Sequence, residues 1–398
     1  MPDLPHRSAY QSAYWREVVL LRRRLVSLKA QTRLLRHELA RKYNPDQPRV
    51  PAGNTGGGQW TSGGGGGATP TGTDFPGDLG NAFSTALNFG DVVPDISGEE
   101  SWSFYQDATR PDGSLAERAV VNRDGSTIHS EFAEPGHKSD WDERHTVTVP
   151  EGGKTTFETS GSTQTIRDGG PDGEAVSRST WTDRGSEREA TVQEARNPSR
   201  PGGPPLSETT ISSALSLYSW LAARNKLDGL QAVLSFNARD YVPSTDAINL
   251  DFISQLREGE VQYACPRLVE VRSHTDAAVE AVEALGRSNF RTAAEFGTAV
   301  HTNLKYQIEA LKDPDFRAER SYLKSYYEGK DGEIPYGSPN SLRIDVYEKR
   351  PDGLVCVYDI KTGRAGLTPD RAAEIAKTVY SRFTGVRRII VTEVRPRR

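Results

Sequence analysis

The chain contains Leu342-Arg343-Ile344-Asp345-Val346-Tyr347-Glu348, followed after a short gap by Leu354-Val355-Cys356-Val357-Tyr358-Asp359-Ile360-Lys361-Thr362-Gly363. Both stretches are rich in β-branched and aromatic residues, which predicts two strands. The turn-forming residues 349–353 separate them, so we expect an antiparallel hairpin. Asp345, Asp359 and Lys361 interrupt the apolar runs. Charges in such strands are costly unless a cation or a charged partner compensates them.

The spacing within the hairpin predicts where these charges lie. If Glu348 pairs with Leu354, side-chain alternation places Asp345, Asp359 and Lys361 on one face of the sheet. The two aspartates are then diagonal neighbours, about 7–8 Å apart at their backbones. One divalent cation can bridge carboxylates at that spacing, and a nearby lysine completes a minimal set for cleaving phosphodiesters. A shift of one residue in the register would separate the three side chains.

The region after residue 205 has the composition of a globular α/β domain. A boundary of Pro and Gly at 200–205 precedes it. The order of helices, strands, helix and strand predicts a mixed sheet with helices packed on it. We expect helices at 207–225, 275–286, 289–311 and about 368–383, and strands at 341–348, 354–361 and 386–394.

The helix expected at 289–311 carries a candidate ligand. Phe296, Val300 and Leu304 form its apolar stripe, and His301 lies at the edge of that stripe, facing the sheet. At 100° per residue, Glu295 lies about 120° away from His301, so both are not expected to reach one site. A glycine one turn before His301 allows a close approach of another backbone.

Three elements in this order resemble the motifs of the PD-(D/E)XK nuclease superfamily, and the RecB-like branch is the most similar. The elements are Gly297-Thr298-Ala299-Val300-His301, then Arg343-Ile344-Asp345, then Tyr358-Asp359-Ile360-Lys361-Thr362-Gly363. The resemblance covers about residues 270–398. It implies a restriction-endonuclease-like mixed sheet flanked by helices, and a DNA-cleaving enzyme that uses Mg²⁺ or Mn²⁺.

The resemblance also assigns roles to residues. It implies that His301, Asp345 and Asp359 bind the metal, and that Asp345, Asp359 and Lys361 are catalytic. Glu295 is a further candidate, as the acidic residue of the wider superfamily. Tyr380 is another, because it matches the tyrosine of a Gln-x-x-x-Tyr motif in which Ala376 replaces the glutamine. The candidates for substrate binding are Arg343 and Arg364.

The remaining sequence predicts three further segments. The chain has 398 residues, with 37 Gly, 24 Pro and 35% hydrophobic residues, which is poor for one compact globule. Residues 1–43 predict a basic amphipathic or coiled-coil helix, with heptad leucines and valine over 8–42 that favour a partner helix or self-association. A Gly/Pro-rich linker at 44–95 follows. Part of it resembles a short segment found in prophage head proteins and bacterial toxin precursors.

Residues 96–199 predict an acidic antiparallel β-meander that acts as a spacer or adaptor. Asp-Gly turn signals alternate there with short Thr/Val/Phe strands. The net charge is −4 for the whole chain, but +7 for 1–50, −12 for 51–205 and +1 for 206–398. An acidic middle segment is a poor surface for nucleic acid, whereas the basic ends are suitable.

The two cysteines do not suggest a disulfide scaffold. Cys356, in the middle of a strand, is interpreted as a small buried hydrophobe. No apolar stretch approaches the length of a membrane span. The apolar patch at 18–21 is too short for a secretory signal. We therefore expect synthesis in a bacterial cytoplasm without a signal peptide, and delivery to a target cell by a dedicated secretion system.

The leading hypothesis is a metal-dependent deoxyribonuclease that forms the C-terminal effector of a bacterial toxin. A catalytic domain behind unrelated modules is typical of such effectors, and it implies an immunity protein as partner. The alternative is a prophage-associated structural or adaptor protein with an inert nuclease fold. RNA is a third possibility as substrate, because arginines near the C-terminus bind the backbone of either polymer.

Overall fold

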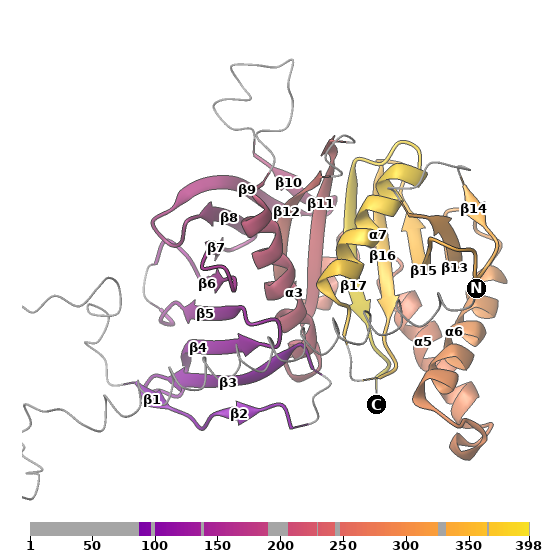
Figure 1. Ribbon diagram of the computed structural model, residues 1–398, viewed down its shortest axis with the longest axis horizontal. Helices are drawn as coiled ribbons and strands as arrows, with labels where there is room; N and C mark the ends of the chain where they lie inside the picture. The colour runs from indigo at the N-terminus through magenta and orange to yellow at the C-terminus, as the bar shows by residue number, and fades with distance from the viewer. Residues whose placement is uncertain are drawn as a thin grey trace, which may run out of the picture. The chain divides into compact units, whose positions relative to one another are not determined.

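The computed structural model describes residues 87–96, 100–136, 139–189, 206–228, 230–242, 247–324, 332–363 and 366–397. The predicted helix at 1–43, most of the linker at 44–95 and Arg364 lie outside the described residues. Residues 88–398 form one compact unit, whose described parts are drawn in colour in Figure 1.

The C-terminal region contains a sheet of seven strands in the order β12-β11-β17-β16-β15-β13-β14. β16 and β17 run parallel, and the other neighbouring strands are antiparallel. The sheet is therefore mixed, as the sequence predicted. Its strands are β11 (Gln231–Val242), β12 (Ala247–Leu256), β13 (Phe316–Leu323), β14 (Glu333–Ile334), β15 (Ser341–Lys349), β16 (Leu354–Ile360) and β17 (Arg388–Val394). The sequence did not predict β11, β12, β13 or the two-residue strand β14.

Helices cover both faces of this sheet. The cores place α5 and α6 on one face, and α3 and α7 on the other; Figure 1 shows α7 lying across β16 and β17. The helices are α3 (Glu208–Asp228), α4 (Glu258–Ala264), α5 (Leu268–Glu283), α6 (Ala293–Glu309) and α7 (Pro369–Arg382), with a short 3₁₀ turn at Arg287–Asn289. The predicted order of helix, hairpin, helix and strand is confirmed.

β16 lies at the centre of the sheet and is buried along its whole length. Val355 and Val357 pack into the core that contains α3 and α7, whereas Cys356 and Tyr358 pack into the core that contains α5 and α6. This is why the sequence of β16 is an almost continuous apolar run rather than an alternating one.

The middle of the chain forms the predicted meander. Its sheet has the order β1-β3-β4-β5-β6-β7-β8-β9-β10, with β2 paired to β3. Asp-Gly turns join the strands: Gly125 has a φ of 89°, and Asp124 accepts a hydrogen bond from the Ser126 amide. The strands are β1 (Asn88–Phe89), β2 (Val93–Pro94), β3 (Trp102–Thr109), β4 (Leu115–Asn122), β5 (Thr127–Phe132), β6 (Glu143–Thr148), β7 (Lys154–Ser160), β8 (Thr163–Asp168), β9 (Glu174–Thr182) and β10 (Gly185–Arg188).

The meander and the seven-stranded sheet share one core, with α3 between them. Tyr218 and Trp220 of α3 are fully buried. They belong to the same apolar cluster as Val147 and Phe157 of the meander and Leu234 of β11. Residues 213–222 of α3 are all buried, so this helix is covered on all sides. α3 therefore completes the core of the meander.

The hairpin of β15 and β16 forms in a register that differs from the prediction. The structure pairs Glu348 with Cys356, not with Leu354, so the prediction was wrong by two residues. The ladder extends through the predicted turn, because the amide of Arg350 donates to the carbonyl of Leu354. Gly353 has a φ of 84°, and a Cβ there would lie 2.7 Å from the carbonyl oxygen of Gly385.

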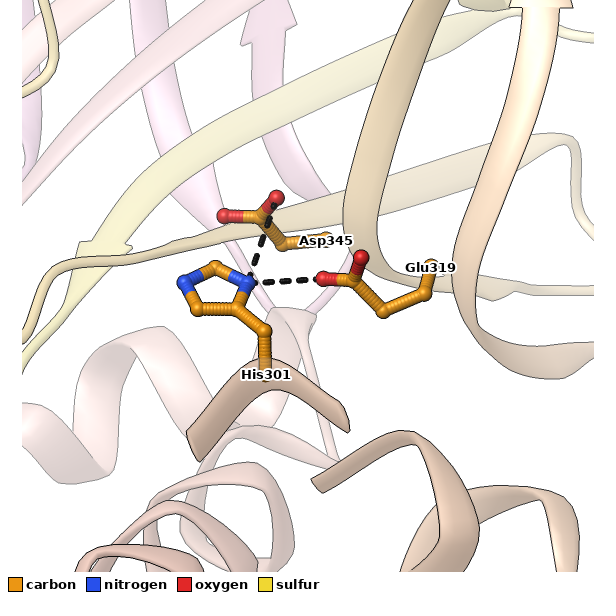
Figure 2. A group of neighbouring side chains, drawn as sticks. All are labelled: His301, Glu319 and Asp345. Atoms are coloured by element: carbon orange, nitrogen blue, oxygen red, sulfur yellow. Dashed lines mark hydrogen bonds and ion pairs between the residues drawn. The ribbon is translucent and has the colours of Figure 1, made fainter. Parts of the chain in front are cut away.

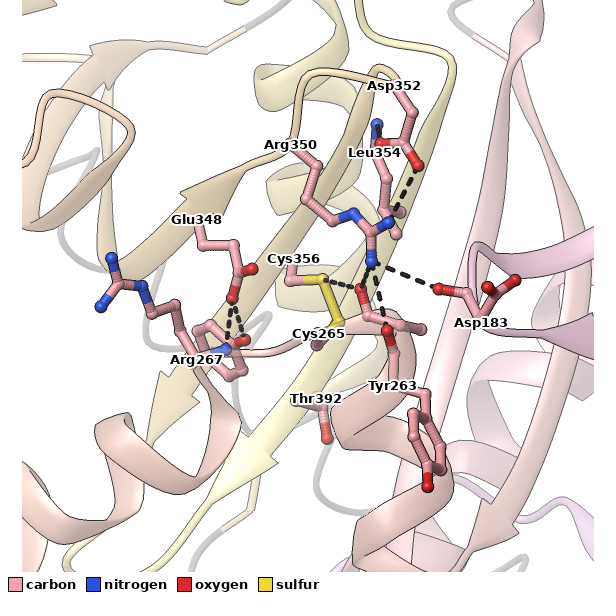
Figure 3. The surroundings of a disulfide bond; sticks show 12 residues. Asp183, Tyr263, Cys265, Arg267, Glu348, Arg350, Asp352, Leu354, Cys356 and Thr392 are labelled. Atoms are coloured by element: carbon pink, nitrogen blue, oxygen red, sulfur yellow. Dashed lines mark hydrogen bonds and ion pairs between the residues drawn. A yellow bond between two sulfur atoms is a disulfide. The ribbon is translucent and has the colours of Figure 1, made fainter.

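The two cysteines form a disulfide, which the sequence interpretation did not expect. Cys265, just after α4, is bonded to Cys356 of β16, and both are buried (Figure 3). The guanidinium of Arg350 donates to the carbonyls of Tyr263, Ala264 and Asp183 beside it. The pair lies 91 residues apart in sequence. The two cysteines meet because the end of α4 and β16 belong to one apolar cluster, and local sequence patterns do not reveal that packing.

Candidate metal centre

α6 brings His301 to the sheet. The Thr292 hydroxyl caps the helix by accepting the Glu295 amide. Phe296 and Val300 then face the sheet and are buried, as predicted. His301 follows at the edge of this stripe, and its side chain is 15% exposed. Its ring can therefore reach polar groups on the strands beneath.

A break in strand alternation aims two carboxylates at His301. Ile344 and Val346 are two residues apart, yet they pack into opposite cores, so the alternation of β15 changes at Asp345. The neighbouring strand β13 carries Glu319 between Ala318 and Arg320, and Glu319 has a left-handed φ of 54°. Left-handed backbone is costly for a glutamate and is concentrated at functional sites.

His301, Glu319 and Asp345 converge on one point (Figure 2). His301 Nδ1 lies 2.7 Å from Glu319 Oε1 and 3.7 Å from Asp345 Oδ1. Among the described residues these three form the one group of His, Cys, Asp and Glu whose ligand atoms all lie within 4.8 Å of one another. Both carboxylates are almost inaccessible to solvent, with side chains 6% and 8% exposed.

One carboxylate oxygen of Asp345, Oδ2, continues the hydrogen bonding between β15 and β16 beyond their last residue pair. The last pair in their register is Val346 with Tyr358. One residue further, Asp345 Oδ2 accepts the amide of Ile360 at 2.9 Å. The carboxylate thus takes the position of a ladder acceptor. Its fixed orientation leaves Oδ1 directed toward His301.

Asp359 and Lys361 form a second group beside the first. Lys361 Nζ lies 2.6 Å from Asp359 Oδ2, and the side chain of Asp359 is 2% exposed. Burial, with the negative charge of Asp345, raises the pKa of Asp359 to about 6, although Lys361 opposes the shift. Asp345 and Asp359 are thus close enough to interact. The structure nevertheless separates the expected ligand set: Asp359 pairs with Lys361, and Glu319 joins His301 and Asp345.

The carboxylates of the first group favour the protonated form of His301. Burial lowers the pKa of His301, but the hydrogen bond to Glu319 and the charge of Asp345 outweigh burial, so the net shift is upward. Arg343 adds a second cation, with Nε 2.7 Å from Glu319 Oε2. Two nearly buried carboxylates therefore depend on nearby positive charge.

The donor set fits a divalent cation. Carboxylate oxygens suit Mg²⁺ and Mn²⁺, and an imidazole nitrogen shifts the preference toward Mn²⁺ and later transition metals. His301 binds a metal only as neutral imidazole, so a cation would replace its proton. The residues that could hold the ion are therefore His301, Glu319 and Asp345, with Asp359 adjacent.

The other candidates from the sequence lie in different places. Glu295 is ion-paired with Arg291 at 2.8 Å on the exposed side of α6, away from His301, as its angle around the helix predicted. Tyr380 of α7 packs against the core shared with α3. Arg343 lies at the site, where its guanidinium is ion-paired with Glu319.

Glu319 is the residue that the sequence analysis missed. It lies in β13, a strand that was not predicted. The only signal for this strand in the sequence is the partial alternation of Phe316, Ala318 and Tyr322. The left-handed backbone that turns Glu319 toward His301 has no signature in the sequence.

Comparison of the chain with models of protein families, with curated proteins and with solved structures gave no match. Among the described residues, no helix is long and apolar enough to cross a membrane.

Proposed function

We propose that this chain is a nuclease that hydrolyses DNA phosphodiester bonds with a divalent cation, Mg²⁺ or Mn²⁺. One observation carries the proposal: the ligand group His301, Glu319 and Asp345 lies against the ion pair of Asp359 and Lys361. A cation site next to a fixed ammonium is suited to phosphodiester hydrolysis, because both stabilise negative charge that develops on the phosphate.

The order of elements supports a restriction-endonuclease-like fold for this part of the chain. The ligand helix α6 is followed by β13, β15 and β16, then by α7 and the parallel strand β17. His301 lies on the helix, and Glu319, Asp345 and Asp359 lie on the three strands, with Lys361 directly after β16. They come from segments far apart in sequence, and they meet where β15 and β16 stop pairing.

The cation, Lys361 and Asp345 would have different roles in the reaction. A bound cation would polarise the scissile phosphate and acidify a water molecule. Lys361, 26% exposed, is held by Asp359 and can place its ammonium beside the negative charge that develops on the phosphate. The amide of Ile360 fixes Asp345, so that this ligand needs little reorganisation.

Cations around the site favour a polyanionic substrate. Arg343 is 31% exposed beside Glu319, and Arg371 of α7 donates to the carbonyl of Arg343. Phosphate groups are attracted to such clusters irrespective of base sequence. The roles of toxin effector and of immunity protein as partner stay predictions from the sequence.

The test is cleavage of supercoiled plasmid by the purified full-length protein with Mg²⁺, with Mn²⁺ and with a chelator. We expect cleavage that depends on the cation and that His301→Ala, Asp345→Asn and Lys361→Ala each abolish. Asp172→Asn, an exposed aspartate of the meander, is the matched control and should cut like wild type. An RNA of similar length tests the alternative substrate.

Two results would overturn the proposal. One is intact DNA and intact RNA with either metal. The other is Asp345→Asn protein that cleaves as fast as the wild type, because a contaminating nuclease would then explain the cutting.

A further inference from the structure

An exposed tyrosine lies next to the candidate metal centre. Tyr336 follows β14, and 76% of its surface is exposed. The guanidinium carbon of Arg343 lies 5.0 Å from the centre of its ring. Arg343 in turn holds Glu319, and Glu319 holds His301. One chain of contacts thus joins an exposed aromatic ring to the ligand group.

A rigid turn presents this ring. The amide and the hydroxyl of Ser338 both donate to the carbonyl of Pro335, and Gly337 has a φ of 78°. Tyr336 and Gly337 are therefore the two central residues of a turn in which a positive φ at the second position favours glycine. The hydroxyl of Ser341 also donates to the carbonyl of Ser338. These bonds fix the backbone that carries the ring.

Exposure alone does not distinguish Tyr336. Tyr263 and Tyr306 are also largely exposed, at 74% and 71%. Tyr306 lines an apolar groove with residues of α5 and α6, and it has no place in the contacts that lead to Glu319. Tyr336 differs because Arg343 packs against its ring, and the same guanidinium is bonded to a ligand of the candidate centre.

We propose that Tyr336 is a base-stacking residue, and that the substrate presents an unpaired base next to the phosphate that is cut. This inference rests on the proposed nuclease function. Aromatic rings bind single-stranded nucleic acid by stacking, with little dependence on sequence. In an intact duplex the bases are already stacked within the helix and cannot reach the ring. The substrate class is therefore DNA with unpaired bases, which means a single strand or a locally melted stretch of a supercoiled plasmid.

The experiment compares one labelled oligonucleotide as a single strand and as a blunt duplex. Cleavage is measured with Mn²⁺, and binding is measured by fluorescence anisotropy in chelator, using the full-length protein. The wild type should prefer the single strand. Tyr336→Ala should weaken binding and raise KM on the single strand by roughly 5- to 150-fold, the range expected for loss of one stacked base. It should change duplex cleavage little.

Two further variants separate stacking from folding. Tyr336→Phe retains the aromatic face and should behave like the wild type. Tyr306→Ala removes a comparably exposed tyrosine elsewhere and should leave the preference for the single strand unchanged. Thermal unfolding of each variant checks that the fold is retained.

The outcomes distinguish the two proposals. If the wild type neither binds nor cuts either oligonucleotide, the nuclease proposal fails and the stacking inference fails with it. If the wild type cuts, but Tyr336→Ala affects both substrates equally or neither, only the stacking inference is overturned. The same holds if Tyr336→Phe loses as much as Tyr336→Ala.

Discussion

Asp359 is a buried carboxylate whose ionisation costs stability. Its pKa is raised to about 6, chiefly by burial and also by Asp345. The folded state therefore holds the proton more tightly than the unfolded state does, where the value is near 3.8. The protonated carboxyl of Asp359 therefore contributes its full stabilisation of the fold below about pH 4, and this contribution is lost as the pH rises through 6. The difference corresponds to about 3 kcal/mol.

We therefore expect Asp359→Asn to be more stable than the wild type at pH 8, by several degrees in Tm, with a smaller gain at pH 5. Asparagine stays neutral, so it removes the cost of a buried charge. Thermal unfolding at the two pH values measures the effect, and Asp172→Asn controls for loss of an exposed charge. A less stable Asp359→Asn at pH 8 would mean that the ion pair with Lys361 outweighs burial.

Substitution of Glu319 tests which residues hold the cation. The structure groups Glu319 with His301 and Asp345, whereas the sequence grouped Asp359 with them. Titration calorimetry with Mn²⁺ should show at least about a tenfold loss of affinity for Glu319→Gln and for Asp345→Asn, because each removes a charged donor. Glu131→Gln, which removes a carboxylate of the meander that is bonded to Arg144, should bind like the wild type. A loss for Asp359→Asn that exceeds the loss for Glu319→Gln would favour the ligand set expected from the sequence.

At the scale of single elements, the sequence predicted the hairpin, α6 and α7 because their patterns are local. Apolar stripes and turn residues carry that information. The predicted register is wrong by two residues, and a shift of two leaves each side chain on the expected face of the sheet. The change of alternation at Asp345 and the left-handed Glu319 then redirected the carboxylates. Such backbone features depend on packing between strands, so the ligand group could be predicted only in part.

The contact between α6 and the loop after β16 gives an element-scale prediction. A Cβ at Gly297 would lie 3.1 Å from the hydroxyl of Thr362, which follows Lys361. Gly297→Ala should therefore shift this loop and reduce cleavage several-fold. Its stability should change little, because the gain in helix propensity, about 1 kcal/mol for alanine over glycine, offsets the cost of shifting the loop.

Gly259→Ala in α4 is the matched control, since no atom lies within 4 Å of a Cβ there. It should retain full activity. Unchanged cleavage by Gly297→Ala would show that the approach of α6 does not position Lys361.

The disulfide acts at the scale of the whole molecule, because it joins segments 91 residues apart. Closing a loop of that size in the unfolded chain is expected to stabilise the fold by about 4–5 kcal/mol. Urea unfolding with and without a reductant should show a decrease of this order. The double variant Cys265→Ala/Cys356→Ala should resemble the reduced protein. Equal stability of oxidised and reduced protein would contradict the prediction.

α3 makes the meander and the seven-stranded sheet depend on each other. Its side chains are buried against both. The Pro/Gly boundary at 200–205 therefore marks a change in composition, but one core includes residues from both sides of it. We expect residues 88–398 to unfold in one cooperative transition. Residues 206–398 alone would expose the face of α3 that contacts Phe157, and should bind a hydrophobic dye without a cooperative transition. If that fragment were instead monomeric and unfolded cooperatively, α3 would need only the sheet, and the meander would be the separate adaptor that its composition suggests.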